Sequence, residues 1–262
     1  IEGRADIGFK DDRTAIDAEL AIMECKAADI IDKFAKDFIP ALNDIDTDAA
    51  FTLDLECKGD YIHSEGTLPD IKASLSVPES FISHKAIGSG LRFSMAAGLE
   101  TLKDGKISAG LRNLSVTGKG ISLKAAADIP DILEEDFLVE LDGNMAADIS
   151  DLKSFLPDTA DINASGRLQA YVKGHIRPSQ LDIYRFSESG LEGRITGDSL
   201  VIVSPKDSID ANIRQLNVTI GPEDKTSRID STKTYHLLAI KGNISSADIR
   251  YGTMALKGDR IG

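Results

Sequence analysis

The stretch Phe51-Thr52-Leu53-Asp54-Leu55-Glu56-Cys57-Lys58 decides the fold class, because apolar and polar residues alternate in it without exception. Side chains of a β-strand point alternately to the two faces of a sheet, so this pattern predicts a strand with one apolar and one polar face. The same alternation recurs at residues 71–77, 91–95, 121–125, 137–141, 168–172, 209–213, 216–220 and 236–244. Short turn signals such as Lys103-Asp104-Gly105-Lys106 separate these runs, which predicts antiparallel neighbours.

Two short stretches have helical spacing instead. Apolar residues of the first, including Ile30, Phe34 and Phe38, recur every three or four positions, which predicts a helix near residues 29–42. The second predicted helix, near residues 148–156, ends before Pro157. The chain is therefore expected to be mainly β, with these two helices.

The two helices belong to an internal repeat. Residues 26–40 align with residues 145–157, and the pair Lys58-Gly59 that ends the following strand aligns with Lys173-Gly174. We therefore expect one repeat unit over residues 1–144 and a second over residues 145–262, joined in one continuous sheet.

Composition excludes several classes of function. The 262 residues carry a net charge of −13, with 30 basic and 43 acidic side chains, which argues against a nucleic-acid partner. No apolar run is long enough to span a bilayer, and Ile1 does not begin a signal peptide, so we expect a piece of a longer protein. Residues 1–4 spell a protease site often placed after tags, and they equally fit the start of a native strand.

A sheet that is apolar on one side needs something to cover that side. Three arrangements are open: a curled trough with its apolar lining exposed, a closed barrel, or two β-sandwich domains. Aromatic residues make up only 5% of the chain and Trp is absent, whereas a sandwich core usually contains large aromatic side chains. We therefore favour the curled, elongated trough, with the two-sandwich arrangement as the alternative.

Acyl chains are the expected filling of such a trough, since they are apolar and mobile. The candidate lipid-contacting residues all lie on the apolar positions of predicted strands. They are Phe51, Leu53, Leu55, Ile71, Leu75, Val77, Leu91, Phe93, Leu123, Leu168 and Val172.

No motif for catalysis or metal binding accompanies them. None of the four His has a second His or Cys at metal-ligand spacing, and no Gly-x-Ser-x-Gly elbow occurs. Acidic clusters such as residues 44–48 and 134–136 fit solvated loops better than a calcium site. We therefore expect no enzymatic activity, no cofactor and no metal. Cys25 and Cys57 are predicted to lie on opposite faces and so to form no disulfide.

One further pattern resembles a known family. The order Ala-Ala-Asp-Ile, short helix, Phe-Leu-Pro, followed by the segments 166–174, 191–195 and 200–203, is similar to the AsmA/TamB-like proteins of Gram-negative envelopes. The resemblance covers most of the chain and rests on the order of these repeated segments, without an invariant motif.

This resemblance implies a half-pipe sheet, often called a β-taco, of the kind found in bridge-like lipid-transfer proteins. It further implies a periplasmic location, an inner-membrane anchor in the full-length protein and phospholipid movement toward the outer membrane, supporting outer-membrane biogenesis. Partners at the inner and outer membranes would be reached through segments that this chain lacks. The alternative function is an adhesion or scaffold module that binds protein or glycan.

Overall fold

The computed structural model describes residues 1–32, 44–85, 89–155, 161–182, 185–222, 227–230, 233–235 and 238–261. Its strands are β1 (Glu2–Lys10), β2 (Arg13–Lys26), β3 (Ile45–Thr47), β4 (Ala50–Ile62), β5 (Asp70–His84), β6 (Leu91–Thr101), β7 (Ile107–Gly118), β8 (Ile121–Ile129), β9 (Val139–Asp148), β10 (Asn163–Ile176), β11 (Glu192–Ser204), β12 (Ile209–Pro222), β13 (Ser227–Asp230), β14 (Lys233–Tyr235), β15 (Leu238–Tyr251) and β16 (Met254–Ile261). Its helices are α1 (Ala27–Ile30) and α2 (Ile149–Leu152), with 3-10 turns η3 (Lys153–Phe155), η4 (Pro178–Leu181) and η5 (Phe186–Glu188).

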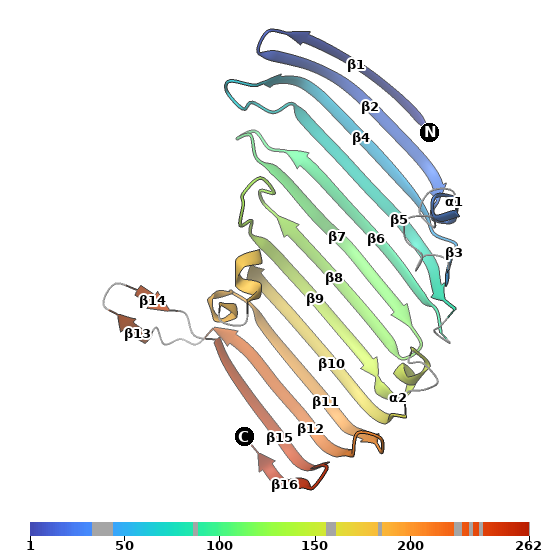
Figure 1. Ribbon diagram of the computed structural model, residues 1–262, viewed down its shortest axis with the longest axis vertical. Coiled ribbons are helices and arrows are strands. Elements are labelled where there is room, and N and C mark those ends of the chain that lie inside the picture. The colour runs from blue at the N-terminus through green and yellow to red at the C-terminus, as the bar shows by residue number, and fades with distance from the viewer. Residues whose placement is uncertain are drawn as a thin grey trace. The chain divides into compact units, whose positions relative to one another are not determined.

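Nearly all of these strands form a single open antiparallel sheet. The 14-stranded sheet has the order β1-β2-β4-β5-β6-β7-β8-β9-β10-β11-β12-β15-β16, with β3 paired to β5 (Figure 1). β13 and β14 form a separate two-stranded sheet. The predicted mainly β fold, an open antiparallel sheet with two short helices, is confirmed. The described strands do not form two sandwiches.

The chain separates into two compact units. The first unit comprises Ile1–Lys85, Arg92–Ser115 and Ala125–Val139, and the second comprises Ala86–Leu91, Val116–Lys124 and Glu140–Gly262. β1, β2, β4 and β5 lie in the first unit, and β10, β11, β12, β15 and β16 lie in the second.

In β11 and β12 of the second unit, the apolar residues change midway between odd-numbered and even-numbered positions. In β12, Ile213 lies opposite Leu200 of β11, while Leu216 lies opposite Gly197, so the apolar positions change from odd to even numbers. Gln215, between them, has a φ of 48°, and Ser199 of β11 has a φ of 52°. The register is unchanged through this point between β11 and β12 and between β12 and β15, so no residue is inserted. The left-handed residues interrupt the pleat, and Leu200 and Leu216 both lie near the position that a Cβ of Gly197 would take, on one face. The runs 209–213 and 216–220 are therefore one strand.

The structure describes only part of the first predicted helix and places helical turns over the second. In the described residues, α1 has 4 residues, and positions 33–42 of the predicted helix lie outside them. α2 also has 4 residues and continues into η3, and Asp148 caps it by accepting a hydrogen bond from the backbone N–H of Ser150. In each unit the helix links two strands that pair with each other, β2 with β4 and β9 with β10.

The glycines that the repeat aligns share an unusual conformation. Gly59 of β4 has a φ of 123° and Gly174 of β10 has a φ of 133°. Glycine adopts this region freely because it has no Cβ. The surroundings differ, because a Cβ at Gly59 would lie 3.6 Å from the nearest atom, while one at Gly174 would lie 2.0 Å from the carbonyl oxygen of Gly190.

Candidate functional site

The predicted lipid-contacting residues of β4 and β5 share one face of the first unit. Leu53 lies opposite Leu75, and Leu55 lies opposite Ala73. Directly opposite residues project to the same side of a sheet, and alternate residues of one strand do likewise. The predicted residues on this apolar face are Phe51, Leu53 and Leu55 of β4 and Ile71, Leu75 and Val77 of β5. Phe93, on β6, is half-buried in the same unit.

β2 extends the apolar face of the first unit with residues that the sequence analysis did not select. Ile22 lies opposite Leu53 and Leu20 lies opposite Leu55. Beyond β2, Ile7 of the edge strand β1 lies opposite Ile16. The alternating residues of β2 could have identified this strand from sequence.

Leu168 and Val172 of β10 lie on the corresponding face of the second unit. Leu168 lies opposite Gly197 and Val172 opposite Gly193, so bulky side chains of β10 face glycines of β11. The left-handed residues Ser199 and Gln215 change the parity of the two strands and bring further residues onto this face that strict alternation does not predict. These are Leu200 and Ile202 of β11 and Leu216, Val218 and Ile220 of β12. Leu123, on β8, is half-buried in this unit.

The helical segment covers one predicted residue of the second unit. A Cβ at Gly118 of β7 would lie 2.5 Å from Leu91 Cδ2, 3.2 Å from Ile121 Cγ2 and 3.3 Å from the ring of Phe155 in η3. Leu91, Ile121 and Phe155 therefore gather above Gly118. An ion pair of 3.3 Å between Lys119 Nζ and Asp151 Oδ1 connects α2 to the turn between β7 and β8. Leu91 is half-buried beside this cluster.

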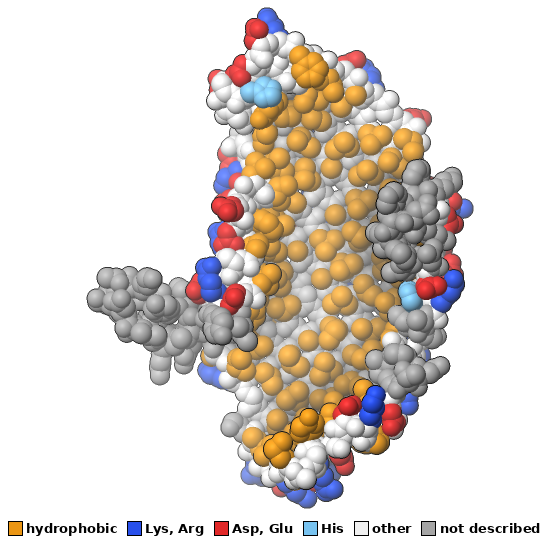
Figure 2. Space-filling view, in the orientation of Figure 1, with side chains coloured by type: hydrophobic (Ala, Val, Ile, Leu, Met, Phe, Trp, Pro, Cys, Tyr) orange, Lys and Arg blue, Asp and Glu red, His pale blue; other side chains and the backbone are white. Residues whose placement is uncertain are grey.

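The two apolar faces remain largely uncovered. Figure 2 shows hydrophobic side chains gathered along the strands, without a second layer of described residues over them. Among the described residues no large side chain is fully buried, and Val172 remains 38% exposed. The chain exposes 17555 Å² at 28.1 kDa, whereas a compact monomer of that mass exposes about 11,000 Å².

The opposite, polar face of the first unit carries a ladder of charges. Glu19 of β2 lies opposite Glu56 of β4, and Lys58 Nζ donates to both carboxylates, at 2.8 and 2.9 Å. The hydrogen bond from Lys58 lowers the pKa of Glu19, and the hydrogen bonds to Glu19 and Glu56 raise the pKa of Lys58. These groups are exposed, so the ladder contributes little to stability and serves mainly to keep this face solvated.

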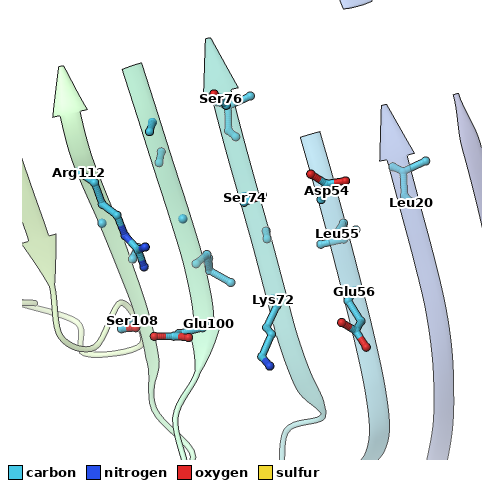
Figure 3. Close-up of a pocket in the computed structure, with 18 of the residues that line it drawn as sticks. Leu20, Asp54, Leu55, Glu56, Lys72, Ser74, Ser76, Glu100, Ser108 and Arg112 are labelled. Carbon is cyan, nitrogen blue, oxygen red and sulfur yellow. The ribbon is translucent and has the colours of Figure 1, made fainter. Parts of the chain in front are cut away.

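A cavity of about 880 Å³ lies on this polar face of the first unit (Figure 3). Lys72, Glu100 and Arg112 project into it, and none of the three has an ion pair or side-chain hydrogen bond. Gly98 and Gly110 leave room in its floor because they have no side chains, and a Cβ at Gly110 would lie 2.6 Å from Asp128 Oδ1. The sequence analysis missed this cavity, which is lined by both acidic and basic side chains.

The cysteine positions correct one prediction. Cys25 lies opposite Phe51 in the register, on the same apolar face as Cys57, because a bulge at Glu24 shifts β2 by one residue. The prediction that Cys25 and Cys57 lie on opposite faces of the sheet was therefore wrong. Both cysteines are free thiols, and Cys57 pairs with Ala18, well down the strand from Cys25. Burial raises the pKa of the Cys57 thiol.

Other kinds of site are not evident in the parts of the chain that the structure describes. No group of three or more His, Cys, Asp or Glu side chains there could hold a metal ion. No described helix is long and apolar enough to cross a bilayer.

Comparison with known proteins gives no relative from which a role could be transferred. The chain matches no family model, no curated protein and no solved structure at a significant level.

Proposed function

We propose that this chain binds the acyl chains of phospholipids along its apolar faces, and that it belongs to a non-enzymatic route for phospholipid between the inner and outer membranes of a Gram-negative cell. One observation carries the proposal. Each unit has a face of Leu, Ile, Val and Phe side chains that no described layer covers. Most of these side chains stay partly exposed, and Val77, at 9%, and Leu200, at 6%, are the buried exceptions.

The physical chemistry of acyl chains suits this face. Burial of one methylene group is worth roughly 0.8 kcal/mol, so ten methylenes of one chain would contribute on the order of 8 kcal/mol. These contacts have no preferred direction, so a chain could move from one strand to the next without a large barrier. The solvated face opposite, with Lys58 between Glu19 and Glu56, has no such affinity.

The resemblance to AsmA/TamB-like proteins supports the cellular part of the proposal, namely the periplasm, an inner-membrane anchor on the full-length protein and a contribution to outer-membrane biogenesis. The uncovered face supports only the binding part. The two parts therefore need separate tests.

Lipid extraction tests the binding part directly. Phospholipid recovered from the purified chain by organic solvent is measured by mass spectrometry for Leu53→Asp and Leu168→Asp, which place a charge on the apolar face of each unit. The matched controls are Thr52→Asp and Gln169→Asp, one residue away on the polar face. We expect several-fold less lipid from the first pair and an unchanged amount from the controls. Equal yields from all four variants, or no lipid in any preparation, would contradict the proposal.

The native thiols provide a second readout. Cys25 and Cys57 lie on the apolar face of the first unit, so added phospholipid should slow their alkylation. A Ser74→Cys thiol in a chain without the two native cysteines reports on the polar face, because Ser74 lies opposite Asp54. Slowing of the native thiols alone supports binding along the apolar face. Equal slowing on both faces would indicate nonspecific coating, and no slowing would contradict binding.

A further inference from the structure

The polar cavity of the first unit has two neighbouring glycines in its floor. The backbone N–H of Leu102 donates to the carbonyl oxygen of Lys106 at 2.7 Å, which closes the turn between β6 and β7. Counted back from this turn, a regular antiparallel ladder places Gly98 of β6 opposite Gly110 of β7. Both glycines line the cavity, so no side chain rises from this part of its floor.

Two side chains of opposite charge lie over these glycines. Arg112 Nη2 is 3.9 Å from the position that a Cβ of Gly98 would take, and Asp128 Oδ1 is 2.6 Å from that of Gly110. The Cβ positions of directly opposite residues are about 5 Å apart, so the guanidinium and the carboxylate are held about 5–10 Å from each other. Neither group has an ion pair or a side-chain hydrogen bond within the described residues.

A second pair of opposite charges projects into the same cavity. Lys72 lies directly opposite Glu56, but Glu56 accepts a hydrogen bond from Lys58 at 2.9 Å. Lys72 extends into the cavity instead, as does Glu100 of β6 (Figure 3). The cavity therefore presents both cationic and anionic groups that the described part of the chain leaves without partners.

We propose that the polar cavity binds a small zwitterion of the size of a dipeptide, with its carboxylate at Arg112 and its ammonium group at Asp128. A guanidinium binds a carboxylate through two parallel N–H donors, and a carboxylate accepts hydrogen bonds from an ammonium group. The two ends of an extended dipeptide are about 7 Å apart, which matches the separation of the two protein groups. The cavity volume of about 880 Å³ is within the range of small-molecule sites.

Other small ligands match the lining less well. None of the described residues that line the cavity is aromatic, so a nucleobase would find no stacking surface. A simple anion would leave Asp128 without a partner, and a simple cation would leave Arg112 without one. The acyl chains of a phospholipid would have to lie on the polar face if its headgroup were bound here, so the site is separate from the proposed lipid-binding faces.

Titration of the unaltered chain with three related ligands tests the proposal. The dipeptide alanyl-alanine should show saturable binding by calorimetry or NMR. Its N-acetylated form lacks the ammonium group and its amidated form lacks the carboxylate, so each should bind about tenfold more weakly. No saturable binding, or equal affinity for all three ligands, would overturn the proposal. Tighter binding of glycerophosphoethanolamine would overturn it in favour of a lipid headgroup.

Charge-removing variants test which residue holds which end. Asp128→Asn should weaken alanyl-alanine about tenfold and leave the affinity of the N-acetylated form unchanged. Arg112→Gln should likewise weaken alanyl-alanine and leave the amidated form unchanged. The matched controls are Arg92→Gln and Glu79→Gln, which remove charges of the first unit that lie outside the cavity. Equal losses for all three ligands in either cavity variant would contradict the assignment.

Filling the floor gives a readout that does not depend on charge. A Cβ at Gly98 would lie 3.5 Å from the carbonyl oxygen of Ala73 and 3.9 Å from Arg112 Nη2, which are ordinary contacts. Gly98→Val should therefore fold and abolish binding of alanyl-alanine, while the phospholipid recovered by solvent extraction stays unchanged. Retained dipeptide binding in this variant would place the ligand outside the cavity and overturn the proposal.

Discussion

The strand pairs β4–β5 and β11–β12 both keep their apolar side chains on one face, but in different ways. β4 and β5 alternate regularly over the register from Thr52 to Lys58, and bulky residues face each other as in Leu53 and Leu75. β11 and β12 interrupt the alternation at Ser199 and Gln215 and place glycines among the apolar residues. The apolar face is kept in both. One pair keeps it through side-chain pattern alone, and the other through backbone conformations that few residue types adopt.

The largest expected difference concerns the two aligned glycines. Gly174→Ala should lower the free energy of unfolding by about 4 kcal/mol, because its Cβ would meet the backbone of Gly190 at 2.0 Å in addition to the unfavourable φ. Gly59→Ala has the same kind of φ without the contact, so a loss of about 2 kcal/mol is expected. Urea denaturation measures both. Equal losses would show that backbone conformation alone matters.

The next largest difference in stability is expected between a buried side chain of the second unit and a half-buried side chain of the first. Leu200 of the second unit is 6% exposed, so Leu200→Ala should cost about 3 kcal/mol. Leu53, on the more open face of the first unit, is only half-buried, and Leu53→Ala should cost about 1 kcal/mol in lipid-free protein. Denaturation with and without phospholipid is the measurement. A large loss at Leu53 without lipid would mean that something in the chain covers this face.

Replacing one residue by glycine should have opposite effects on stability in β11–β12 and in β4–β5. Gln215→Gly should stabilise by about 0.5 kcal/mol, because glycine adopts the φ of 48° without a steric penalty. Thr52→Gly, in the regular part of β4, should destabilise by about 1 kcal/mol. If thermal melting showed that both glycines destabilise, the left-handed backbone would not be the native conformation at Gln215.

The smallest expected effect is a pH dependence. The pKa of Glu19 is lowered by the hydrogen bond from Lys58, so its contribution to stability is present above the ordinary glutamate pKa and is lost as pH falls through the lowered value. Between about pH 5 and 3, the chain should therefore lose slightly more stability than Lys58→Met does. Arg194→Met is the control in the second unit, since Arg194 donates to the amide of Asn217 at 2.9 Å and that acceptor does not titrate. Parallel pH profiles for the chain and Lys58→Met would contradict the assignment.

Alternation predicted the strands and the shared face of β4 and β5 well, because every apolar residue between Phe51 and Cys57 falls on one parity. It failed at Cys25, where one extra residue at Glu24 reverses the face. It also divided β12 into two strands. The left-handed residues at these positions are Glu, Ser and Gln, which carry no strong turn signal, so only the folded backbone reveals them. The polar cavity includes Gly98 and Gly110, and the need for glycine at position 110 appears only once folding places Asp128 beside it.

The order of the strands has a consequence for how the chain folds. Almost every strand of the large sheet pairs with the next one along the sequence, as β4 does with β5 and β11 with β12. Contacts between sequence neighbours close short loops, which costs little chain entropy and favours fast formation for an all-β protein. A chain of this kind can grow by adding one hairpin at a time to an existing edge. Until the next strand arrives, each newly formed edge is itself exposed to the wrong partner.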